Sequence, residues 1–200
     1  MKIKIGVLSM VLAVLWCFAV PAQAQGPTAY VRSILDRAMA VQTNPGLAGA
    51  AHEKERAREV HQIIASSFDF PMMARESLGA TYGRLSPGQQ AEFTQVFSFL
   101  FQNSYTRLVL NFLKKENVVY TKETFEDFRA QVNTKMERPN ETIPVDYKMH
   151  RQGQGWVLYD VIVDGVSILH DYETQFARVI QTRGYAVLLE KMKKQYEAIR

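Results

Sequence analysis

The sequence predicts an α+β fold in which helices come first, an antiparallel sheet of about four strands follows, and helices close the chain. Apolar residues recur at helical spacing from Thr28 to Lys115, alternate with a period of two residues from Val118 to Val163, and return to helical spacing after Asp171. Short polar turns separate the alternating segments, which is typical of a meander. Because the sequence has no internal repeat and no linker, we expect a single domain over residues 25–200.

The first 24 residues have the pattern of a secretory signal peptide. Lys2 and Lys4 precede an apolar run from Ile5 to Val20, and Ala22-Gln23-Ala24 follows as a cleavage site. A membrane anchor needs about 20 apolar residues, and this run is shorter. We therefore expect cleavage after residue 24. The short basic start indicates a bacterial signal, and export into a periplasm or into the medium is left open.

Charge and cysteine content exclude several classes of protein. Cys17 is the only cysteine and lies inside the apolar run, so the exported chain has neither disulfides nor thiolate metal ligands. Removal of Lys2 and Lys4 with the signal peptide lowers the formal net charge from +4 to +2. This small excess predicts no nucleic-acid partner.

Three helices are expected before the longest one. The first runs from Thr28 to Gln42 and is stopped by Asn44-Pro45-Gly46, and the second runs from about Ala51 to Ser67. A short third helix follows, with Asp69 as its N-cap, and it ends at Gly79.

The longest predicted helix extends from Ser86 to Lys115. Ser86 and Gln89 form a capping box, and Pro87 occupies the first helical position. The apolar side chains spread around the helix instead of forming one narrow stripe, so the helix must be covered on most sides. A kink near Asn103-Ser104 is left open.

Four segments have the alternation of half-buried strands: Val118–Thr121, Phe128–Met136, Ile143–Met149 and Trp156–Val163. The last of them is apolar on both faces except at Asp160.

After the fourth strand we expect a turn and two closing helices. Asp164-Gly165 forms the turn, and residues 166–168 continue extended. Asp171 then caps a helix that Gly184 ends, and a last helix begins at Tyr185.

Nine short motifs, in order along nearly the whole exported chain, resemble the MlaC family of periplasmic phospholipid carriers and their toluene-tolerance relatives. They are Phe68–Phe70, Met73–Arg75, Leu78-Gly79, Leu85–Pro87, Ser104-Tyr105, Val145–Tyr147, Trp156–Val161, Gly165–Ser167 and Tyr172–Phe176. One departure is Tyr82, where relatives often have Trp.

The resemblance implies a fold, a cargo and two membrane partners. The sheet would be curved, with helices over its concave side, and acyl chains would enter a hydrophobic cavity between helices and sheet. The domain over residues 25–200 would then be a lipid carrier, monomeric and without enzymatic activity or cofactor. It would shuttle phospholipid between an outer-membrane lipoprotein complex and an inner-membrane ABC transporter, maintaining outer-membrane lipid asymmetry. A hopanoid is an alternative cargo.

Such a cavity must be deep and apolar. Burial of one CH₂ is worth about 0.8 kcal/mol, so two acyl chains of about 16 carbons would cost on the order of 25 kcal/mol in water. Each residue that we expect to line the cavity is equally consistent with an ordinary core position. The candidates are Met72, Met73, Phe97, Phe101, Tyr105, Leu108, Tyr147, Val161, Val163, Val166, Ile168, Tyr172, Phe176 and Ile180.

Two interpretations of Asp160 remain open. It either pairs with Arg75 or Arg107 near the mouth of the cavity, or it satisfies backbone and hydroxyl groups. Arg75, Arg107, Arg178 and Arg183 could meet a phosphate, and the basic residues from Lys191 onward could touch a membrane partner or anionic lipid. A solvated face is favoured for both sets.

Two further classes of function are alternatives to the carrier. The sequence has four histidines but no H-E-x-x-H, G-x-S-x-G, P-loop or G-x-G-x-x-G motif. A cofactor-free isomerase or hydrolase would instead use Asp160 with Tyr147 or Tyr159. An adaptor that bridges membrane complexes without holding lipid is the third hypothesis.

Overall fold

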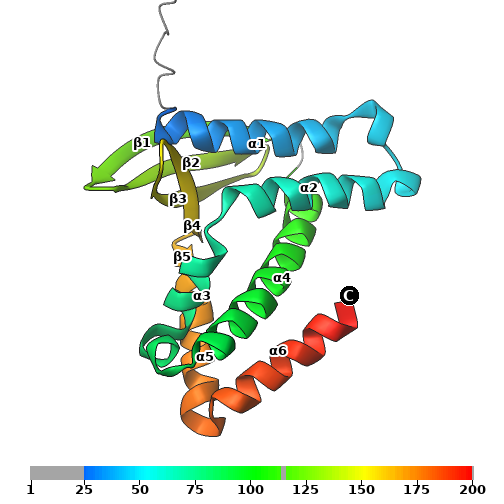
Figure 1. Ribbon diagram of the computed structural model, residues 1–200. Coiled ribbons are helices and arrows are strands. Elements are labelled where there is room, and N and C mark those ends of the chain that lie inside the picture. Colours follow the sequence, from blue (N-terminus) through cyan, green and yellow to red (C-terminus); the bar gives the residue numbers. More distant parts are fainter. Residues whose placement is uncertain (1–24, 114–115, 200) are drawn as a thin grey trace, which may run out of the picture.

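A computed structural model describes residues 25–113 and 116–199 of the chain. The predicted signal peptide and the predicted end of the long helix at Lys115 lie outside these residues. The described chain contains six α-helices and a five-stranded antiparallel sheet, with most of the helices before the strands and two after them (Figure 1). The α+β prediction is confirmed.

The first three helices agree with the predicted order. α1 is Pro27–Thr43, α2 is Glu53–Ser67 and α3 is Phe70–Leu78, with short 3₁₀ turns at Pro45–Leu47, Ala50–His52 and Gly79–Arg84. α1 and α2 run side by side (Figure 1). The carboxylate of Asp69 accepts a hydrogen bond from the Met72 amide at 2.9 Å, so the predicted N-cap of α3 is present.

The long helix α4 spans Pro87–Phe112 without interruption, so it has no break at Asn103-Ser104. Its capping box is formed as predicted, because Ser86 Oγ accepts from the Gln89 amide and Gln89 Oε1 accepts from the Ser86 amide. At the other end the side-chain amide of Gln42 lies 2.7–3.0 Å from three terminal carbonyl oxygens of α4. α1 therefore caps the C-terminus of α4.

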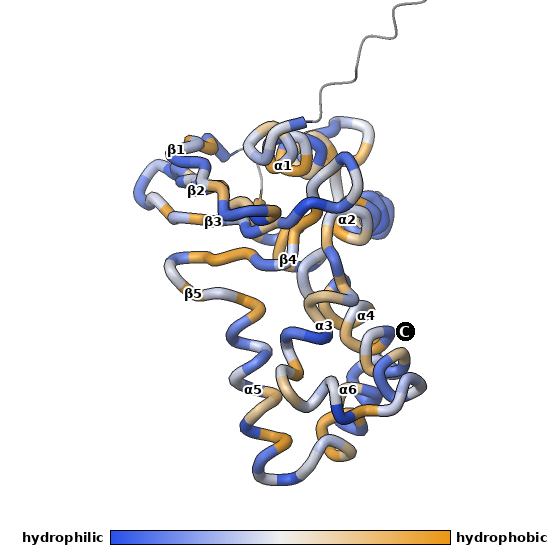
Figure 2. The backbone as a smooth tube through the Cα atoms, turned by 60° about the vertical axis from the view of Figure 1, so that its left-hand side comes forward, coloured by the Kyte–Doolittle hydropathy of each residue, from blue (hydrophilic) through white to orange (hydrophobic). Residues whose placement is uncertain are grey.

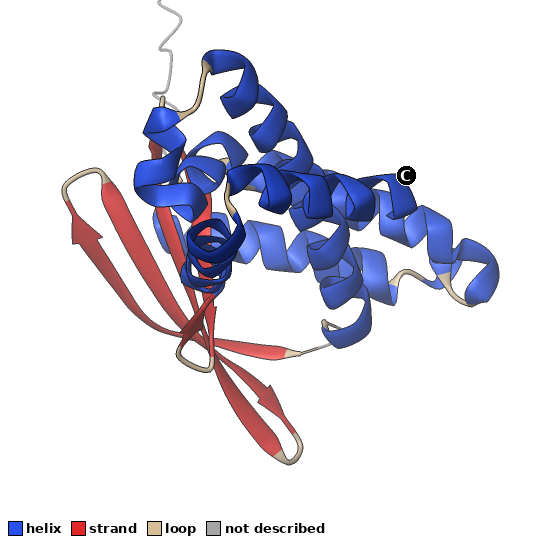
Figure 3. Ribbon diagram, turned by 90° about the horizontal axis from the view of Figure 1, so that it is seen from below, coloured by secondary structure: helices blue, strands red, loops and turns tan. Residues whose placement is uncertain are grey.

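The sheet is a meander in the order β1-β2-β3-β4-β5. Its strands are β1 Asn117–Glu126, β2 Arg129–Arg138, β3 Glu141–Gln152, β4 Gly155–Val163 and β5 Val166–Ser167. Four long strands were expected, and β5 adds a two-residue fifth. The sheet is twisted and unclosed, and the helices gather on one side of it (Figure 3). β1 runs five residues beyond the predicted end at Thr121, after an irregularity between Tyr120 and Lys122.

Two helices close the chain, α5 at Ile168–Arg183 and α6 at Tyr185–Ile199. The predicted start at Asp171 is wrong, and Ile168 is helical instead of extended. Ser167 is the N-cap, since its hydroxyl accepts from the His170 amide at 3.0 Å. The same hydroxyl donates to Asp160 in β4 at 2.7 Å, which fixes the helix start next to the sheet.

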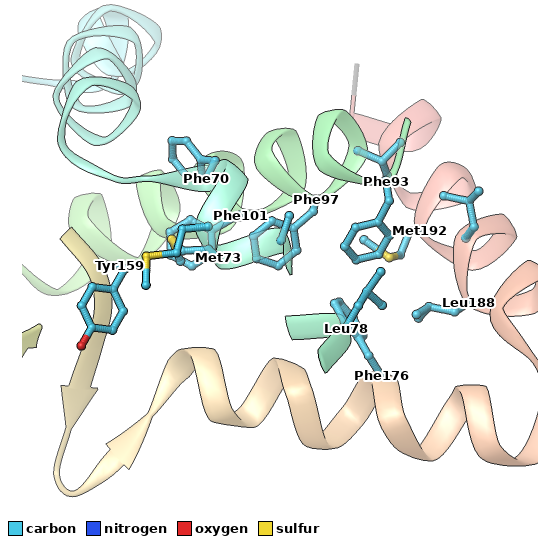
Figure 4. Packing of buried hydrophobic residues seen from close by; sticks show 14 of the residues in the cluster. Phe70, Met73, Leu78, Phe93, Phe97, Phe101, Tyr159, Phe176, Leu188 and Met192 are labelled. Atoms are coloured by element: carbon cyan, nitrogen blue, oxygen red, sulfur yellow. The ribbon is translucent and has the colours of Figure 1, made fainter. Parts of the chain in front are cut away.

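The buried side chains form two clusters. The sheet cluster lies between α1 and the sheet and consists of Val31, Leu35, Ala38, Leu113, Ala130, Val132, Val145, Tyr147, Met149, Trp156, Leu158 and Val161. The helical cluster is formed almost entirely by α2–α6 and is rich in Phe and Met (Figure 4). It consists of Val60, Ile64, Phe70, Met72, Met73, Ala74, Leu78, Phe93, Val96, Phe97, Phe101, Tyr159, Phe176, Leu188, Leu189 and Met192.

β4 is the boundary between the two clusters, and it is buried along most of its length and hydrophobic in the colouring of Figure 2. The edge of β4 that faces away from β3 contacts the start of α3, where the Asp69 amide donates to the Leu158 carbonyl at 2.8 Å. His150 in β3 lies 2.9 Å from the Asp69 carboxylate. Because β5 pairs with the same edge, both α3 and α5 leave the sheet there, and the helical cluster lies beyond it (Figure 1).

Candidate functional site

An apolar pocket of about 340 Å³ lies between α4, α5 and α6. α4 contributes a helical row, α5 contributes two aromatic residues, and α6 closes the far side. The lining residues are Phe97, Leu100, Phe101, Ser104, Arg107, Tyr172, Phe176, Met192, Gln195, Ala198 and Ile199. The pocket therefore lies within the helical part of the molecule, and its lining includes no strand residue.

Aromatic rings form the inner wall of this pocket. The Phe97 ring packs edge-on against Tyr172 at 5.4 Å and against Phe176 at 6.3 Å between centroids. Figure 4 shows Phe97 and Phe101 extending from α4 towards the helix that carries Phe176. Because this wall consists of apolar rings and the thioether of Met192, it suits a long apolar ligand better than a small polar one.

The pocket also has a polar side, formed by Ser104, Arg107 and Gln195. Arg107 is exposed to solvent and places a guanidinium at the rim, a group that binds phosphate through several N–H donors. A few polar groups beside an apolar interior fix the orientation of a ligand. The arrangement is suited to an amphipathic molecule whose apolar part enters and whose polar part stays at the surface.

Tyr105 lies directly behind the pocket wall. Its ring stacks on Phe101 with 4.3 Å between centroids and an interplanar angle of 6°. Burial raises the pKa of the Tyr105 hydroxyl well above its ordinary value, and the Tyr172 hydroxyl and the Asp160 carboxylate raise it further. The hydroxyl oxygen is buried, and the raised pKa favours its neutral form.

The structure brings four of the predicted lining residues together in the pocket wall: Phe97, Phe101, Tyr172 and Phe176. The others lie elsewhere. Met72 and Met73 are buried in the helical cluster, and Tyr105 and Ile180 pack against it. Tyr147 and Val161 belong to the sheet cluster, Val163 packs against it, and Ile168 contacts both clusters. Leu108 and Val166 lie on the surface, with exposed fractions of 44% and 61%.

The contribution of α6 to the pocket was not predicted from the sequence. Met192, Gln195 and Ile199 lie three and four residues apart, the spacing of one helix face. That spacing indicates a common helix face, but the local sequence does not indicate that this face packs against α4. Arg107 had been considered as a partner of Asp160, and it lines the pocket instead.

Asp160 serves the structural role. Its side chain is 3% exposed, and its two oxygens accept from Ser167 Oγ at 2.7 Å and from the Leu169 amide at 3.1 Å. Arg75 lies near Glu76 instead. A carboxylate that holds a helix start in this way is a poor candidate for a general base.

A second hollow of about 480 Å³ lies on the sheet beside the β1–β2 hairpin. Polar and charged side chains, among them Glu126, Arg129, Gln131 and Lys148, form most of its lining. It offers no apolar interior, so the pocket between α4, α5 and α6 is the better candidate site.

The basic residues of α6 are partly neutralised. Lys193 pairs with Glu92 of α4, and Lys194 pairs with Glu190 at 2.8 Å. These exposed pairs contribute little to stability. Among residues 25–113 and 116–199, no group of acidic, His or Cys side chains has the arrangement of a metal site. Over the same residues, no helix is long and apolar enough to cross a membrane.

The fold is shared with a protein whose structure is known. A phospholipid-binding protein from Ralstonia solanacearum, solved in complex with a phospholipid, superimposes with a TM-score of 0.72. The alignment covers 86% of this chain and 96% of that one at 24% sequence identity. The structure thus places the chain among α+β proteins that have a twisted, unclosed sheet and a helical part, which here contains an apolar pocket.

The chain also matches a family model over most of its length. The family model described as "MlaC protein" matches residues 32–194, and the chain therefore belongs to the MlaC family. A comparison with curated proteins gives no match.

Proposed function

We propose that this protein is an exported phospholipid carrier that holds acyl chains in the pocket between α4, α5 and α6. The observation that carries the proposal is the combination of an aromatic interior with a charged rim at Arg107. The phospholipid bound by the Ralstonia solanacearum protein supports it, because nearly the whole of that chain superimposes on this one.

The size of the pocket indicates how a lipid would be accommodated. About 340 Å³ is near the lower end of the roughly 300–1,000 Å³ that ligand pockets span. A diacyl phospholipid is larger than a typical ligand, so the helices around the pocket must separate to admit it. The Phe and Met side chains of the helical cluster suit such a change, because thioether and aromatic groups repack without losing directional bonds.

Membership of the MlaC family supports the wider role. In this proposal the protein acts in the periplasm as a monomer and moves phospholipid between an outer-membrane lipoprotein complex and an inner-membrane ABC transporter. The predicted signal peptide is consistent with that location. The proposed carrier function requires neither a cofactor nor a nucleic acid.

Lipid extraction tests the binding step. Protein purified from an exporting host should yield about one phospholipid per chain by mass spectrometry of a solvent extract. Phe101→Asp, which places a charge in the pocket wall, should remove most of that lipid. Phe125→Asp is the matched control, because Phe125 is 59% exposed on the β1–β2 hairpin, and it should retain the lipid. A hopanoid in the extract in place of phospholipid would identify a different cargo. An extract without lipid would contradict the carrier function.

A transfer assay tests the shuttling step. The lipid-loaded protein should exchange labelled phospholipid between two populations of vesicles that are separated by a membrane permeable to the protein alone. Retention of the label on the protein, with no arrival in acceptor vesicles, would leave a binding protein without a transport role.

A further inference from the structure

Tyr105 carries a buried hydroxyl for which the described residues offer no hydrogen-bond partner. Buried polar groups are nearly always paired, and an unpaired one is costly enough to require an explanation. Among the described residues, the only other buried side-chain oxygen or nitrogen of this kind is Thr106 Oγ1.

The two hydroxyls differ in what the helix can do for them. A threonine in a helix can donate to the carbonyl four residues earlier by rotating about χ1. Ser98 already makes such a bond, with its Oγ 2.6 Å from the Thr94 carbonyl oxygen. The Tyr105 hydroxyl is at the end of a rigid ring and reaches no carbonyl of its own turn. Only Tyr105 therefore points to a partner outside the helix.

The surroundings of Tyr105 define the partner. Its ring is fixed between Phe101 at 4.3 Å and Phe68 at 5.9 Å between centroids. A tyrosine hydroxyl is neutral at neutral pH and can donate its proton in a hydrogen bond. Asp160 is nearby, but its two oxygens accept from Ser167 and Leu169, and neither is hydrogen-bonded to Tyr105. The partner must be an uncharged acceptor, because a second anion in this buried region would carry a large desolvation cost.

Phe101 and Tyr172, the neighbours of Tyr105, both line the pocket. Tyr105 itself does not line the pocket, so a lipid would have to separate these rings to reach its hydroxyl. The ester carbonyl of such a lipid is a neutral acceptor located between the polar head and the acyl chains. Arg107 at the rim and Tyr105 behind the wall then match the order of phosphate and ester along one lipid.

We propose that Tyr105 donates a hydrogen bond to an ester carbonyl of the bound lipid and so selects ester-linked glycerolipids. The inference rests on the proposed function and adds a specificity to it. It predicts discrimination against lipids without a carbonyl, such as a polycyclic hydrocarbon, which would leave the hydroxyl unpaired.

Matched phospholipids test this selection. Delipidated full chain, purified after export, is equilibrated with vesicles that contain equal amounts of diacyl and dialkyl-ether phosphatidylglycerol with the same chain length. The wild-type protein should take up the ester lipid about three- to tenfold more than the ether lipid. Tyr105→Phe, which removes only the hydroxyl, should bring this ratio to about 1 while still binding both.

Thermal unfolding of the delipidated protein gives an independent readout. Tyr105→Phe should raise Tm by about 2–4 °C, because it removes an unpaired buried hydroxyl. Tyr30→Phe is the control, since the Tyr30 hydroxyl donates to the Ser67 carbonyl at 3.3 Å. It should lower Tm and leave the lipid ratio unchanged. Equal uptake of the two lipids by the wild type would overturn this inference alone, whereas uptake of neither would overturn the carrier as well.

Discussion

The helical cluster and the sheet cluster are similar in extent but differ in chemistry. The sheet cluster is mainly aliphatic, with Tyr147 and Trp156 as its aromatic members, and Val132 and Met149 are fully buried on paired strands. Its buried Thr134 hydroxyl donates to the Val145 carbonyl at 2.7 Å. The helical cluster is aromatic and Met-rich, borders the apolar pocket, and adjoins the unpaired Tyr105 hydroxyl. The hydroxyl beside the sheet cluster is thus paired, whereas the one beside the helical cluster has no partner among the described residues.

Both clusters therefore contribute to stability, whereas the proposed lipid pocket adjoins only the helical cluster. Strand pairing fixes the sheet cluster through backbone hydrogen bonds that a ligand does not disturb. The helices around the pocket are held mainly by side-chain packing, which can rearrange. Substitutions in the two clusters should therefore affect stability alike and lipid content differently.

The largest expected effect comes from truncating one residue in each cluster. Phe97→Ala should destabilise the delipidated protein by about 3–5 kcal/mol and Met149→Ala by about 2–5 kcal/mol, since both side chains are fully buried. Only Phe97→Ala should reduce the lipid that co-purifies, because Phe97 lines the pocket. Denaturant titration and lipid extraction measure the two quantities, and equal lipid loss in both variants would remove the distinction between the clusters.

The junction between the clusters gives the next effect. Asp160→Asn should cost about 1–3 kcal/mol, because the amide nitrogen cannot accept one of the two hydrogen bonds that the carboxylate accepts. Asp164→Asn is the control at an exposed turn position with φ of 51°, which Asn tolerates. A fall in Tm for Asp160→Asn alone is expected. Unchanged stability would show that the carboxylate does not hold α5 to the sheet.

A smaller effect is expected at the start of α4, far from the sheet. Ser86→Ala removes the capping box and should cost about 1 kcal/mol, with a range of about 0.5–2. Ser98→Ala, within the same helix, should be neutral or slightly stabilising, because Ser98 bonds only to its own helix backbone. If chemical denaturation ranks the two variants in the opposite order, the cap does not stabilise α4.

The smallest effect at neutral pH concerns the buried tyrosines of both clusters. Burial raises the pKa of Tyr105 and Tyr147 above the ordinary value of about 10. A raised folded-state pKa stabilises the protein fully below pH of about 10 and loses this contribution as the pH rises further. Tyrosinate absorbance should therefore increase together with unfolding above this pH. Ionisation of all tyrosines before loss of far-ultraviolet circular dichroism would contradict the burial of these hydroxyls.

Features with local causes could be predicted from the sequence. The capping box of Ser86 and Gln89 depends on residues three apart, and the alternation in β2 and β3 records one buried face. The end of β1 could not be predicted, because this edge strand is mostly exposed after Thr121 and carries no burial pattern. Ser167 was missed as the N-cap because Asp171 is an equally good local candidate, and contact with Asp160 decides between them.

The candidate site was only partly predictable for the same reason. Phe97 and Phe101 are conspicuous in the sequence as an aromatic row on one helix face. That this row faces α5 and α6, and not the sheet, depends on where α5 leaves β4. The side chains at Leu108 and Val166 have the same apolar chemistry, but this long-range geometry places them on the surface.

Photoaffinity labelling tests most directly the claim that lipid binds in the helical cluster. A phospholipid with a diazirine in one acyl chain is loaded onto the full chain, irradiated, and the labelled peptides are sequenced. If acyl chains bind in the pocket, labels are expected on α4, α5 and α6, at or next to Phe101, Tyr172 and Met192. Labels confined to α1, β2 and β3 would place the acyl chains in the sheet cluster and contradict the account.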